Sequence, residues 1–261
     1  MGDMDGKVAL VTAASRGLGR ATALALARRG ARVAICSRDP AAAASAATAI
    51  AKETGAETWS SAADVSKRDE VSKFVGDAVS RFGGVDVLVS NTGGPPQGDF
   101  EDFGDADWQR AFDLVVMSAI RLVREVLPHM RPRGGGRILF ILSTSVREPI
   151  DHLILSNVTR PALAGLSKSL ARELAKDLIL VNAVAPGTIL TDRVRELRAA
   201  AAEREGISLE ESLARSGREI PLGRLGEPEE FAALAAFLAS PEASYLTGGF
   251  YAVDGGRLRG I

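Results

Sequence analysis

The chain has 261 residues, of which 46% are apolar and 25% charged, and its 32 basic and 33 acidic residues leave a formal net charge of −1. This length and composition indicate one large globular domain. The balanced charge gives no electrostatic reason to expect a nucleic-acid or anionic-membrane partner. The N-terminus lacks a signal pattern, and no apolar run reaches the roughly 18–20 residues of a membrane span, so we expect a cytoplasmic protein.

Short apolar runs rich in β-branched residues alternate with helical patterns along the chain. The predicted strands span residues 7–12, 32–37, 85–90, 137–142, 179–184 and 249–256, and the predicted helices span 19–30, 41–54, 71–83, 106–130, 160–177 and 227–239. This alternation predicts an α/β fold of the Rossmann type, a doubly wound parallel sheet of about seven strands with helices on both faces. No linker divides residues 1–261, so we predict a single domain.

Two smaller features complete this outline. Residues 189–220 are charged and helical in places, and they are inserted between a strand and the next helix. Such excursions at the carboxyl ends of strands often close over ligands, and a solvated surface helix is the alternative. The single cysteine, Cys36, lies in an apolar run and is predicted to be buried rather than reactive.

A turn of small residues follows the first predicted strand. It consists of Thr12, Ala13, Ala14, Ser15, Arg16, Gly17, Leu18 and Gly19. Small residues between a strand and a helix let backbone N–H groups approach a pyrophosphate, and the helix N-terminus adds a favourable dipole. The spacing resembles the T-G-x-x-x-G-x-G turn of the short-chain dehydrogenase/reductase family. Ala13 stands at the first glycine position, where a methyl group is tolerable if φ is negative and costly otherwise.

The resemblance to this family extends over nearly the whole chain. "AADVS" (62–66) resembles its Asp-Val pair, which implies that Asp64 and Val65 lie near the adenine. "SNTGG" (90–94) resembles its Asn-Ala-Gly-Gly turn, and "APGTILT" (185–191) resembles the turn that holds the nicotinamide end. The resemblance therefore implies a dinucleotide site that also includes Asn91, Thr92, Gly93, Pro186, Gly187, Ile189 and Thr191.

The tip of the second predicted strand favours NADP(H) over NAD(H) as cofactor. An acidic residue at this tip would bind the two ribose hydroxyls of NAD, but here Ser37 and Arg38 stand there. A guanidinium pairs bidentately with a 2′-phosphate, and Arg16 could reach the same group. Asp39 is the counter-argument, because it could pair with Arg38 or repel the phosphate.

The family's catalytic residues are a Ser and a Tyr that bind the substrate oxygen, a Lys, and an Asn on the preceding helix. The Tyr is the general acid/base, and the Lys lowers its pKa and holds the nicotinamide ribose. The resemblance places the Ser at Ser143, with Ser145 as the second choice. Ser156 then stands at the Tyr position, Arg160 at the Lys position and Val115 at the Asn position.

No shift of register restores this motif. The only tyrosines are Tyr245 and Tyr251, near the C-terminus, and Lys168, the nearest lysine, lies inside the helix. Arg160 keeps a positive charge for the ribose but cannot serve as a proton donor. His152 is an alternative acid/base group that Asp151 could orient.

Three functions follow from this pattern. The first is an oxidoreductase that transfers a hydride between NADP(H) and a carbonyl or secondary alcohol, with an altered proton relay. The second is a dinucleotide-binding protein with a regulatory role, and the third is a non-redox dehydration or isomerisation. All three require a small-molecule ligand and no metal. We expect Arg147 and Glu148 to pair on the surface, and the resemblance implies a homodimer or homotetramer through the helices near 106–130 and 152–177.

Overall fold

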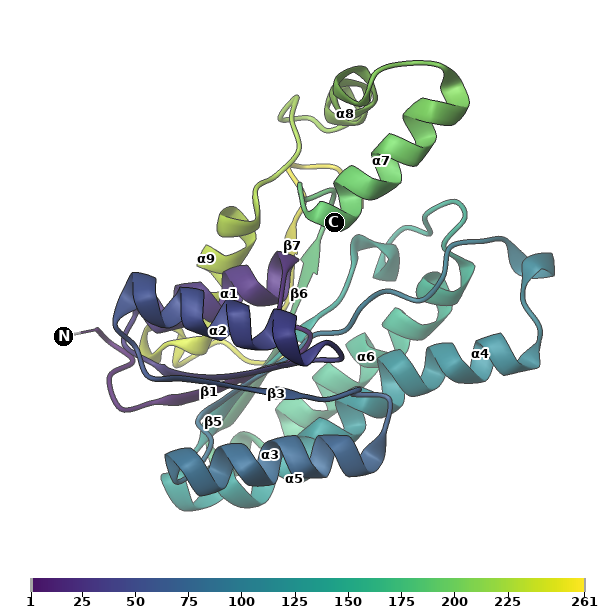
Figure 1. Cartoon of the computed structure of the whole chain (residues 1–261). Coiled ribbons are helices and arrows are strands. Elements are labelled where there is room, and N and C mark those ends of the chain that lie inside the picture. Colours follow the sequence, from purple (N-terminus) through teal and green to yellow (C-terminus); the bar gives the residue numbers. More distant parts are fainter. Residues whose placement is uncertain (1, 261) are drawn as a thin grey trace.

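One parallel sheet of seven strands forms the centre of the molecule (Figure 1). The computed structural model describes residues 2–260. The strands are β1 (Val8–Val11), β2 (Arg32–Ser37), β3 (Thr58–Ala62), β4 (Val87–Ser90), β5 (Gly136–Ile141), β6 (Ile179–Pro186) and β7 (Phe250–Val253). Their order across the sheet is β3-β2-β1-β4-β5-β6-β7, and all six neighbouring pairs are parallel. This confirms the predicted fold class, and the reversal of strand order between β1 and β4 opens a crevice at the carboxyl ends of the strands.

Helices cover both faces of the sheet (Figure 1). One face packs against α1 (Gly17–Arg28), α2 (Pro40–Thr54) and α9 (Pro228–Ala239). The other packs against α3 (Arg68–Phe82), α5 (Ser118–Met130) and α6 (Ile154–Glu173), with α4 (Asp105–Phe112) beside α6. Because the central strands are buried on both faces, they appear in the sequence as continuous apolar runs. Cys36 is among the fully buried residues, and burial raises the pKa of its thiol to about 12, so the predicted unreactive cysteine is confirmed.

The start of α6 differs from the prediction. The sequence pattern placed the helix from residue 160, but it begins at Ile154 and contains Pro161 in its interior. The buried residues of its first turns are Leu155 and the polar Ser156, Thr159 and Arg160. Three of these four are polar, so apolar periodicity is weak where the helix begins, and Ser156 and Arg160 are one turn apart on the same face.

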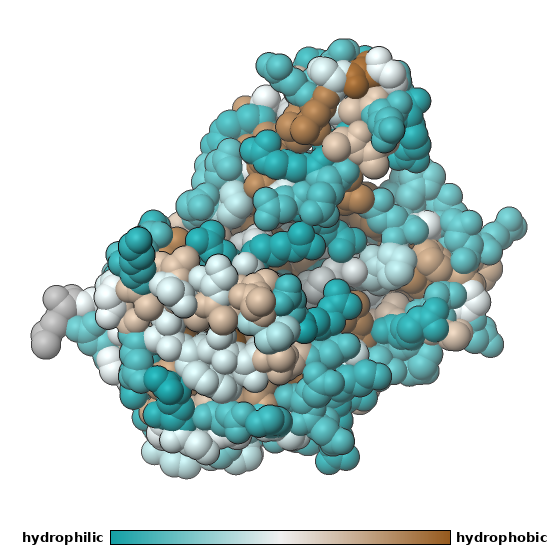
Figure 2. All heavy atoms as spheres, viewed as in Figure 1, coloured by the Kyte–Doolittle hydropathy of each residue, from teal (hydrophilic) through white to brown (hydrophobic). Residues whose placement is uncertain are grey.

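Residues 189–220 contain two helices that extend beyond the carboxyl ends of the strands (Figure 1). These are α7 (Asp192–Glu205) and α8 (Leu209–Arg218). Thr191 begins α7 by accepting a hydrogen bond from the backbone N–H of Val194 through its side chain. Figure 2 shows apolar side chains among hydrophilic ones on this projection, whereas the rest of the visible face is mostly hydrophilic. None of the helices in residues 2–260 is long and apolar enough to cross a bilayer.

Candidate functional site

The turn between β1 and α1 has the backbone that a phosphate loop requires. Gly17 has a φ of +58°. A Cβ atom added at Gly19 would lie 2.6 Å from the carbonyl oxygen of Ala13 and 2.8 Å from Nδ2 of Asn91, so only glycine fits there. Arg16 precedes α1 without capping it through its side chain, which leaves the first N–H groups of the helix without a side-chain acceptor. These features fit a bound pyrophosphate.

Ala13 is strained in this loop, because its φ is +48°, in the left-handed region that favours glycine. The loop is nevertheless held on both sides. The N–H of Ala14 donates to the carbonyl of Cys36, and Nδ2 of Asn91 donates to the carbonyl of Ala13 at 3.2 Å. The chain thus keeps the glycine-like backbone of the family turn despite the methyl group.

Replacing Ala13 by glycine should stabilise the protein. A left-handed alanine costs about 1–2 kcal/mol, and the extra freedom of glycine in the unfolded chain offsets about 0.4–1 kcal/mol of that gain. We expect Ala13→Gly to raise the free energy of unfolding by about 0.5–1 kcal/mol in urea titrations. The neighbouring Ala14 is fully buried and does not have a positive φ, so Ala14→Gly should instead lower the free energy of unfolding. A destabilised Ala13→Gly variant would refute the assigned strain.

The tip of β2 offers an exposed cation beside a carboxylate that is already engaged. Oδ1 of Asp39 accepts from the N–H groups of Ala41 and Ala42 at 2.9 and 3.2 Å, and so caps α2. The Ser37 hydroxyl donates to the carbonyl of Asp39. Arg38 is exposed and has no hydrogen bond or ion pair within residues 2–260. The considered Arg38–Asp39 pair is therefore not formed, which leaves Arg38 available to an anion.

The opposite wall of the crevice comes from the ends of β3 and β4. Oδ1 of Asp64 accepts from the N–H and the hydroxyl of Ser66, while Val65 is buried. The N–H of Asn91 donates to the Thr12 hydroxyl, which in turn donates to the carbonyl of Asn91 at 2.7 Å. Thr92 is half-buried and Gly93 is exposed. These contacts bring β1 and β4 together at the switch point of the sheet.

The segment after β6 approaches the phosphate loop from the other side. A Cβ on Gly187 would lie 2.7 Å from Asp254, so glycine is needed where Pro186 ends the strand. Ile189 is buried. A Cβ on Gly17 would lie 3.6 Å from the methyl group of Thr191, which puts the start of α7 over the loop.

An exposed ion pair also links α7 to the phosphate loop. Nη1 of Arg16 lies 3.1 Å from Oε1 of Glu196. This pair is exposed on both sides and contributes little stability. Arg16 could therefore exchange Glu196 for a phosphate at small cost. Neither the spacing nor the motif of the phosphate loop indicated Glu196 as its partner.

A cluster of polar side chains lies where β5 meets the first turns of α6. Nη1 of Arg160 donates to the carbonyls of Ile141 and Leu142 at 3.0 and 2.8 Å, and its Nε donates to the Ser156 hydroxyl at 3.1 Å. Ser156 and Arg160 are 6% and 8% exposed, so this is a buried network that joins the helix to the sheet. The Nη2 group has no partner within residues 2–260.

The two candidate serines differ in access. The hydroxyl of Ser143 accepts from the N–H of Ser145 at 3.1 Å, and Ser143 is half-buried. Ser145 is 3% exposed, and its buried hydroxyl has no partner in the described chain. Ser143 is therefore the more accessible to a ligand oxygen.

The charge at Arg160 is uncompensated. Burial first, and then the charge of Arg193, lower the pKa of Arg160 to about 10. A guanidinium with this pKa is still charged at neutral pH. Arg193, from α7, donates from Nη2 to the carbonyl of Pro95 at 3.5 Å. The sequence motifs did not indicate Arg193, because nothing in its spacing connects it with α6.

His152 has a different partner from the expected one. Its Nδ1 lies 2.9 Å from Oδ2 of Asp99, so Asp99 rather than Asp151 orients the imidazole. His152 has a φ of +58° and precedes α6, so it does not lie one helical turn before Ser156 on the same helix. Its side chain is 73% exposed.

The expected Arg147–Glu148 pair is also wrong. Oε1 of Glu148 accepts from the N–H of Arg259. The guanidinium of Arg147 lies over the ring of Phe250, 5.1 Å from its centroid. The two side chains therefore meet different segments near the C-terminus.

Neither tyrosine belongs to the core on the α6 face of the sheet, as far as residues 2–260 show. Tyr245 is 99% exposed, and the partly buried Tyr251 packs against the core on the α1–α9 face. Lys168 is twelve residues beyond Ser156 on α6, about 18 Å along the helix axis. Val115 is buried in a π-helical turn, Asp113–Met117, between α4 and α5. Such turns often mark functional sites, although this one presents an apolar side chain.

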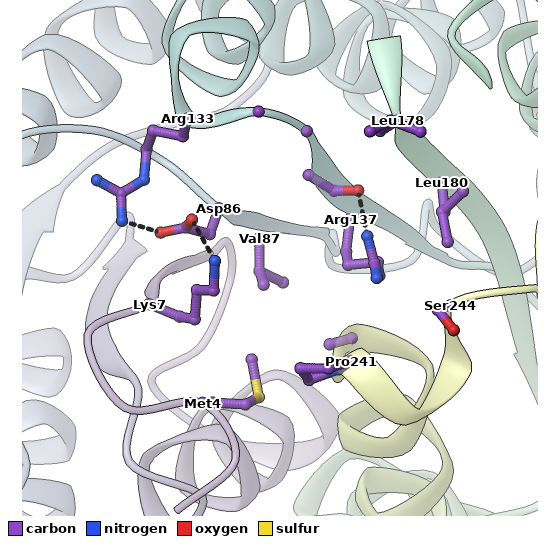
Figure 3. A pocket seen from close by; sticks show the side chains of 14 residues that line it. Met4, Lys7, Asp86, Val87, Arg133, Arg137, Leu178, Leu180, Pro241 and Ser244 are labelled. Carbon is purple, nitrogen blue, oxygen red and sulfur yellow. Dashed lines mark hydrogen bonds and ion pairs between the residues drawn. The ribbon is translucent and has the colours of Figure 1, made fainter. Parts of the chain in front are cut away.

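Two cavities lie outside this cluster. A cavity of about 340 Å³ runs between the phosphate loop and α2, where it contacts Arg16 and Asp192. A cavity of about 370 Å³ lies at the amino ends of the strands, where Asp86 binds Lys7 and Arg133 (Figure 3). The second cavity is at the opposite edge of the sheet from the phosphate loop, so it is not part of the dinucleotide crevice.

Comparison with known proteins shows to which family the chain belongs. A family model described as "Enoyl-(Acyl carrier protein) reductase" matches residues 12–257. The chain belongs to the short-chain dehydrogenase/reductase family. It is 37% identical over 256 residues to dehydrogenase/reductase SDR family member 4 of Bos taurus, which covers 98% of this chain and 88% of that protein.

Solved structures of this family show the same fold. An L-sorbose reductase from Gluconobacter frateurii, complexed with NADPH and L-sorbose, is 36% identical with a TM-score of 0.96 and covers 100% of this chain and 99% of that one. A 7α-hydroxysteroid dehydrogenase complexed with NADH is 32% identical with a TM-score of 0.87 and covers 99% and 96%. The chain is accordingly an NAD(P)-dependent oxidoreductase of this family.

Proposed function

We propose that the chain is an NADP(H)-dependent oxidoreductase that interconverts a carbonyl and a secondary alcohol through an altered proton relay. The observation that carries the proposal is the set of groups at one edge of the sheet. The glycine-dependent loop follows β1, and Arg38 follows β2 without a hydrogen bond or ion pair in residues 2–260. Ser143 follows β5, and Arg160 of α6 donates to the carbonyls at the end of that strand. Gly17, Gly19, Asn91 and Thr191 would hold the dinucleotide, and Leu18, Ser15 and Thr12 would shape the loop.

NADPH bound in this crevice supplies the hydride. Ser143 donates its hydroxyl proton in a hydrogen bond to the substrate oxygen, and the fixed charge of Arg160 stabilises the negative charge that develops there. Arg160 cannot give up a proton, and the Ser156 hydroxyl is too weak an acid. The proton therefore comes from water or from the His152–Asp99 pair.

Removing the charge at Arg38 should weaken the binding of NADPH but not that of NADH. A charge-assisted hydrogen bond contributes about 1.5–3 kcal/mol, so we expect Arg38→Gln to raise the Kd for NADPH about 10- to 100-fold. The Kd for NADH should stay within about threefold, because NADH has no 2′-phosphate. Fluorescence titration of both cofactors checks this. Arg172→Gln is the control and should change neither constant, because Arg172 of α6 is exposed and has no ion pair within residues 2–260. Equal loss for both cofactors would contradict the 2′-phosphate contact.

Turnover tests the proton relay. Purified protein with NADPH should reduce at least one compound in a panel of ketones and oxo acids, followed by nicotinamide absorbance. We expect Ser143→Ala to lower kcat about 10²-fold, and His152→Gln to lower it by 10² or more if histidine supplies the proton. Asp99→Asn should then reproduce part of the His152→Gln loss. An unchanged kcat in His152→Gln assigns the proton to water.

The regulatory alternative makes the opposite prediction. If no compound turns over but NADPH binds tightly, the dinucleotide has a structural or regulatory part. Ser156→Tyr combined with Arg160→Lys then restores the family pattern. Turnover gained by that double variant would support this alternative, whereas a double variant less active than a turning-over wild type excludes it.

The same proposal treats residues 1–261 as one NAD(P)-binding domain in which α7 and α8 cover the substrate. A cytoplasmic location remains a prediction. A homodimer or homotetramer is supported by Phe112 of α4 and Val158 of α6, which are 38% and 44% exposed on the helices where the resemblance places the interface. Native mass measurement would check the assembly.

A further inference from the structure

Two arginines at the crevice have no carboxylate partner. Arg160 is buried and donates only to neutral oxygens, the carbonyls of Ile141 and Leu142 and the hydroxyl of Ser156. Arg193 is exposed, and among residues 2–260 its side chain donates only to the carbonyl of Pro95, so of the two only Arg160 is a buried charge. Neither residue forms an ion pair within the described range 2–260. A buried charge without a counter-charge is costly, so it usually marks a place that an anion fills.

The two arginines approach the ends of the neighbouring strands β4 and β5. In agreement with this placement, the charge of Arg193 is, after burial, the second cause that lowers the pKa of Arg160. Arg193 extends from α7 over the turn that follows β4, where its Nη2 would lie 3.4 Å from a Cβ on Gly94. Arg160 lies below, at the end of β5. The pair therefore borders the crevice from the α7 side and from the α6 side.

The carboxylates at this rim are engaged elsewhere. Glu196 pairs with Arg16, Asp99 with His152, and Glu148 accepts from the N–H of Arg259. Asp254 accepts from the N–H groups of Gly256 and Leu258. Asp192 precedes Arg193 but lines the cavity beside the phosphate loop, and consecutive helical residues do not face each other. None of these groups neutralises Arg160 or Arg193.

We propose that the space between Arg160 and Arg193 binds a carboxylate of the substrate, so that the enzyme reduces an oxo acid rather than a neutral ketone. This rests on the oxidoreductase function proposed above. Guanidinium groups match carboxylates in geometry as well as charge, and the Nη2 group of Arg160 is free to donate. The step consumes one hydride from NADPH and one proton from water or from the His152–Asp99 pair. The C=O bond becomes C–OH, and NADPH becomes NADP⁺.

Binding tests the carboxylate site without turnover. The protein saturated with NADP⁺ is titrated at constant ionic strength with oxamate and benzoate, and with their neutral counterparts oxamide and benzamide. We expect at least one carboxylate to bind at least about tenfold more tightly than its amide. Arg193→Gln should abolish this difference. Arg195→Gln should keep it, because Arg195 is an exposed arginine of the same helix whose side chain has no partner within residues 2–260. The Kd for NADP⁺ should stay within threefold in both variants.

Two outcomes would overturn the inference. Equal binding of the acids and the amides shows that no carboxylate site exists. A large loss of NADP⁺ binding in Arg193→Gln with an unchanged preference for acids assigns the arginine to the cofactor's pyrophosphate. Because neither measurement needs a reaction, a failure to find turnover leaves the carboxylate site testable. If turnover is found, the ratio of kcat/KM for an oxo acid and its methyl ester should fall at least tenfold in Arg193→Gln.

Discussion

Replacing Gly19 by alanine is expected to abolish most of the affinity for NADPH, with a rise in Kd of about 100-fold. An added Cβ would lie 2.6 Å from the carbonyl oxygen of Ala13, 2.8 Å from Nδ2 of Asn91 and 3.0 Å from Cα of Ala14. Two of these atoms belong to backbone, so the phosphate loop itself must move. Loss of one or two charge-assisted N–H contacts to phosphate accounts for about this change in affinity. Fluorescence or calorimetric titration with NADPH measures it.

The same substitution should also cost stability. Forcing a methyl group into a packed site costs about 1–3 kcal/mol of unfolding free energy. Gly165→Ala in α6 is the matched control, because no atom lies within 4 Å of a Cβ there. That control should gain up to about 1 kcal/mol from helix propensity and leave the Kd unchanged. An affinity within threefold of wild type in Gly19→Ala would show that the loop does not contact the dinucleotide as proposed.

Among single substitutions in the polar cluster where β5 meets α6, Arg160→Met should lower the free energy of unfolding most. The variant leaves the carbonyls of Ile141 and Leu142 without the guanidinium that now satisfies them. Each buried carbonyl without a donor costs about 1–3 kcal/mol, and relief of the buried charge offsets part of this. We expect a net loss of about 2–3 kcal/mol in urea unfolding, together with loss of turnover.

Two further variants separate the causes of that loss. Arg160→Lys keeps a charge but donates fewer hydrogen bonds, so it should lose less stability, about 1 kcal/mol. Arg172→Met on the exposed side of the same helix should stay within about 0.5 kcal/mol of wild type. If Arg160→Met is as stable as wild type, the hydrogen bonds to β5 are not what anchors the start of α6.

These expectations give Arg160 two roles. It joins the first turns of α6 to the end of β5, and it keeps a positive charge beside Ser143. A lysine at this position offers one ammonium group, whereas the guanidinium reaches two carbonyls and the Ser156 hydroxyl at once. The smaller Ser156 is thereby incorporated into a hydrogen-bonded network. The first turns of α6 are consequently held to the end of β5 by this network.

The sequence by itself located six of the seven strands and the turn of small residues after β1, but not the partly exposed β3. Strands buried on both faces appear as continuous apolar runs, and close backbone approach requires small residues at fixed spacing, so both features are local. The absence of any tyrosine near residue 156 is likewise readable from the chain. The start of α6 could not be located in this way, because Ser156, Thr159 and Arg160 on its buried face are polar and only Leu155 among the buried residues there is apolar.

Only the tertiary structure decided which side chains meet in the crevice. Asp99 reaches His152 across 53 positions, and the charge of Arg193 acts on Arg160 from a different helix. The sequence left open whether Asp39 pairs with Arg38 or repels a phosphate, and the structure shows that its carboxylate caps α2. The pattern of apolar and small residues within a strand, helix or turn is local and can be seen in the sequence. Ion pairs and charge balance depend on side chains that are distant in sequence and meet only in the folded chain. For that reason the fold followed from the pattern of residues, while the uncompensated charge beside Ser156 required the folded chain.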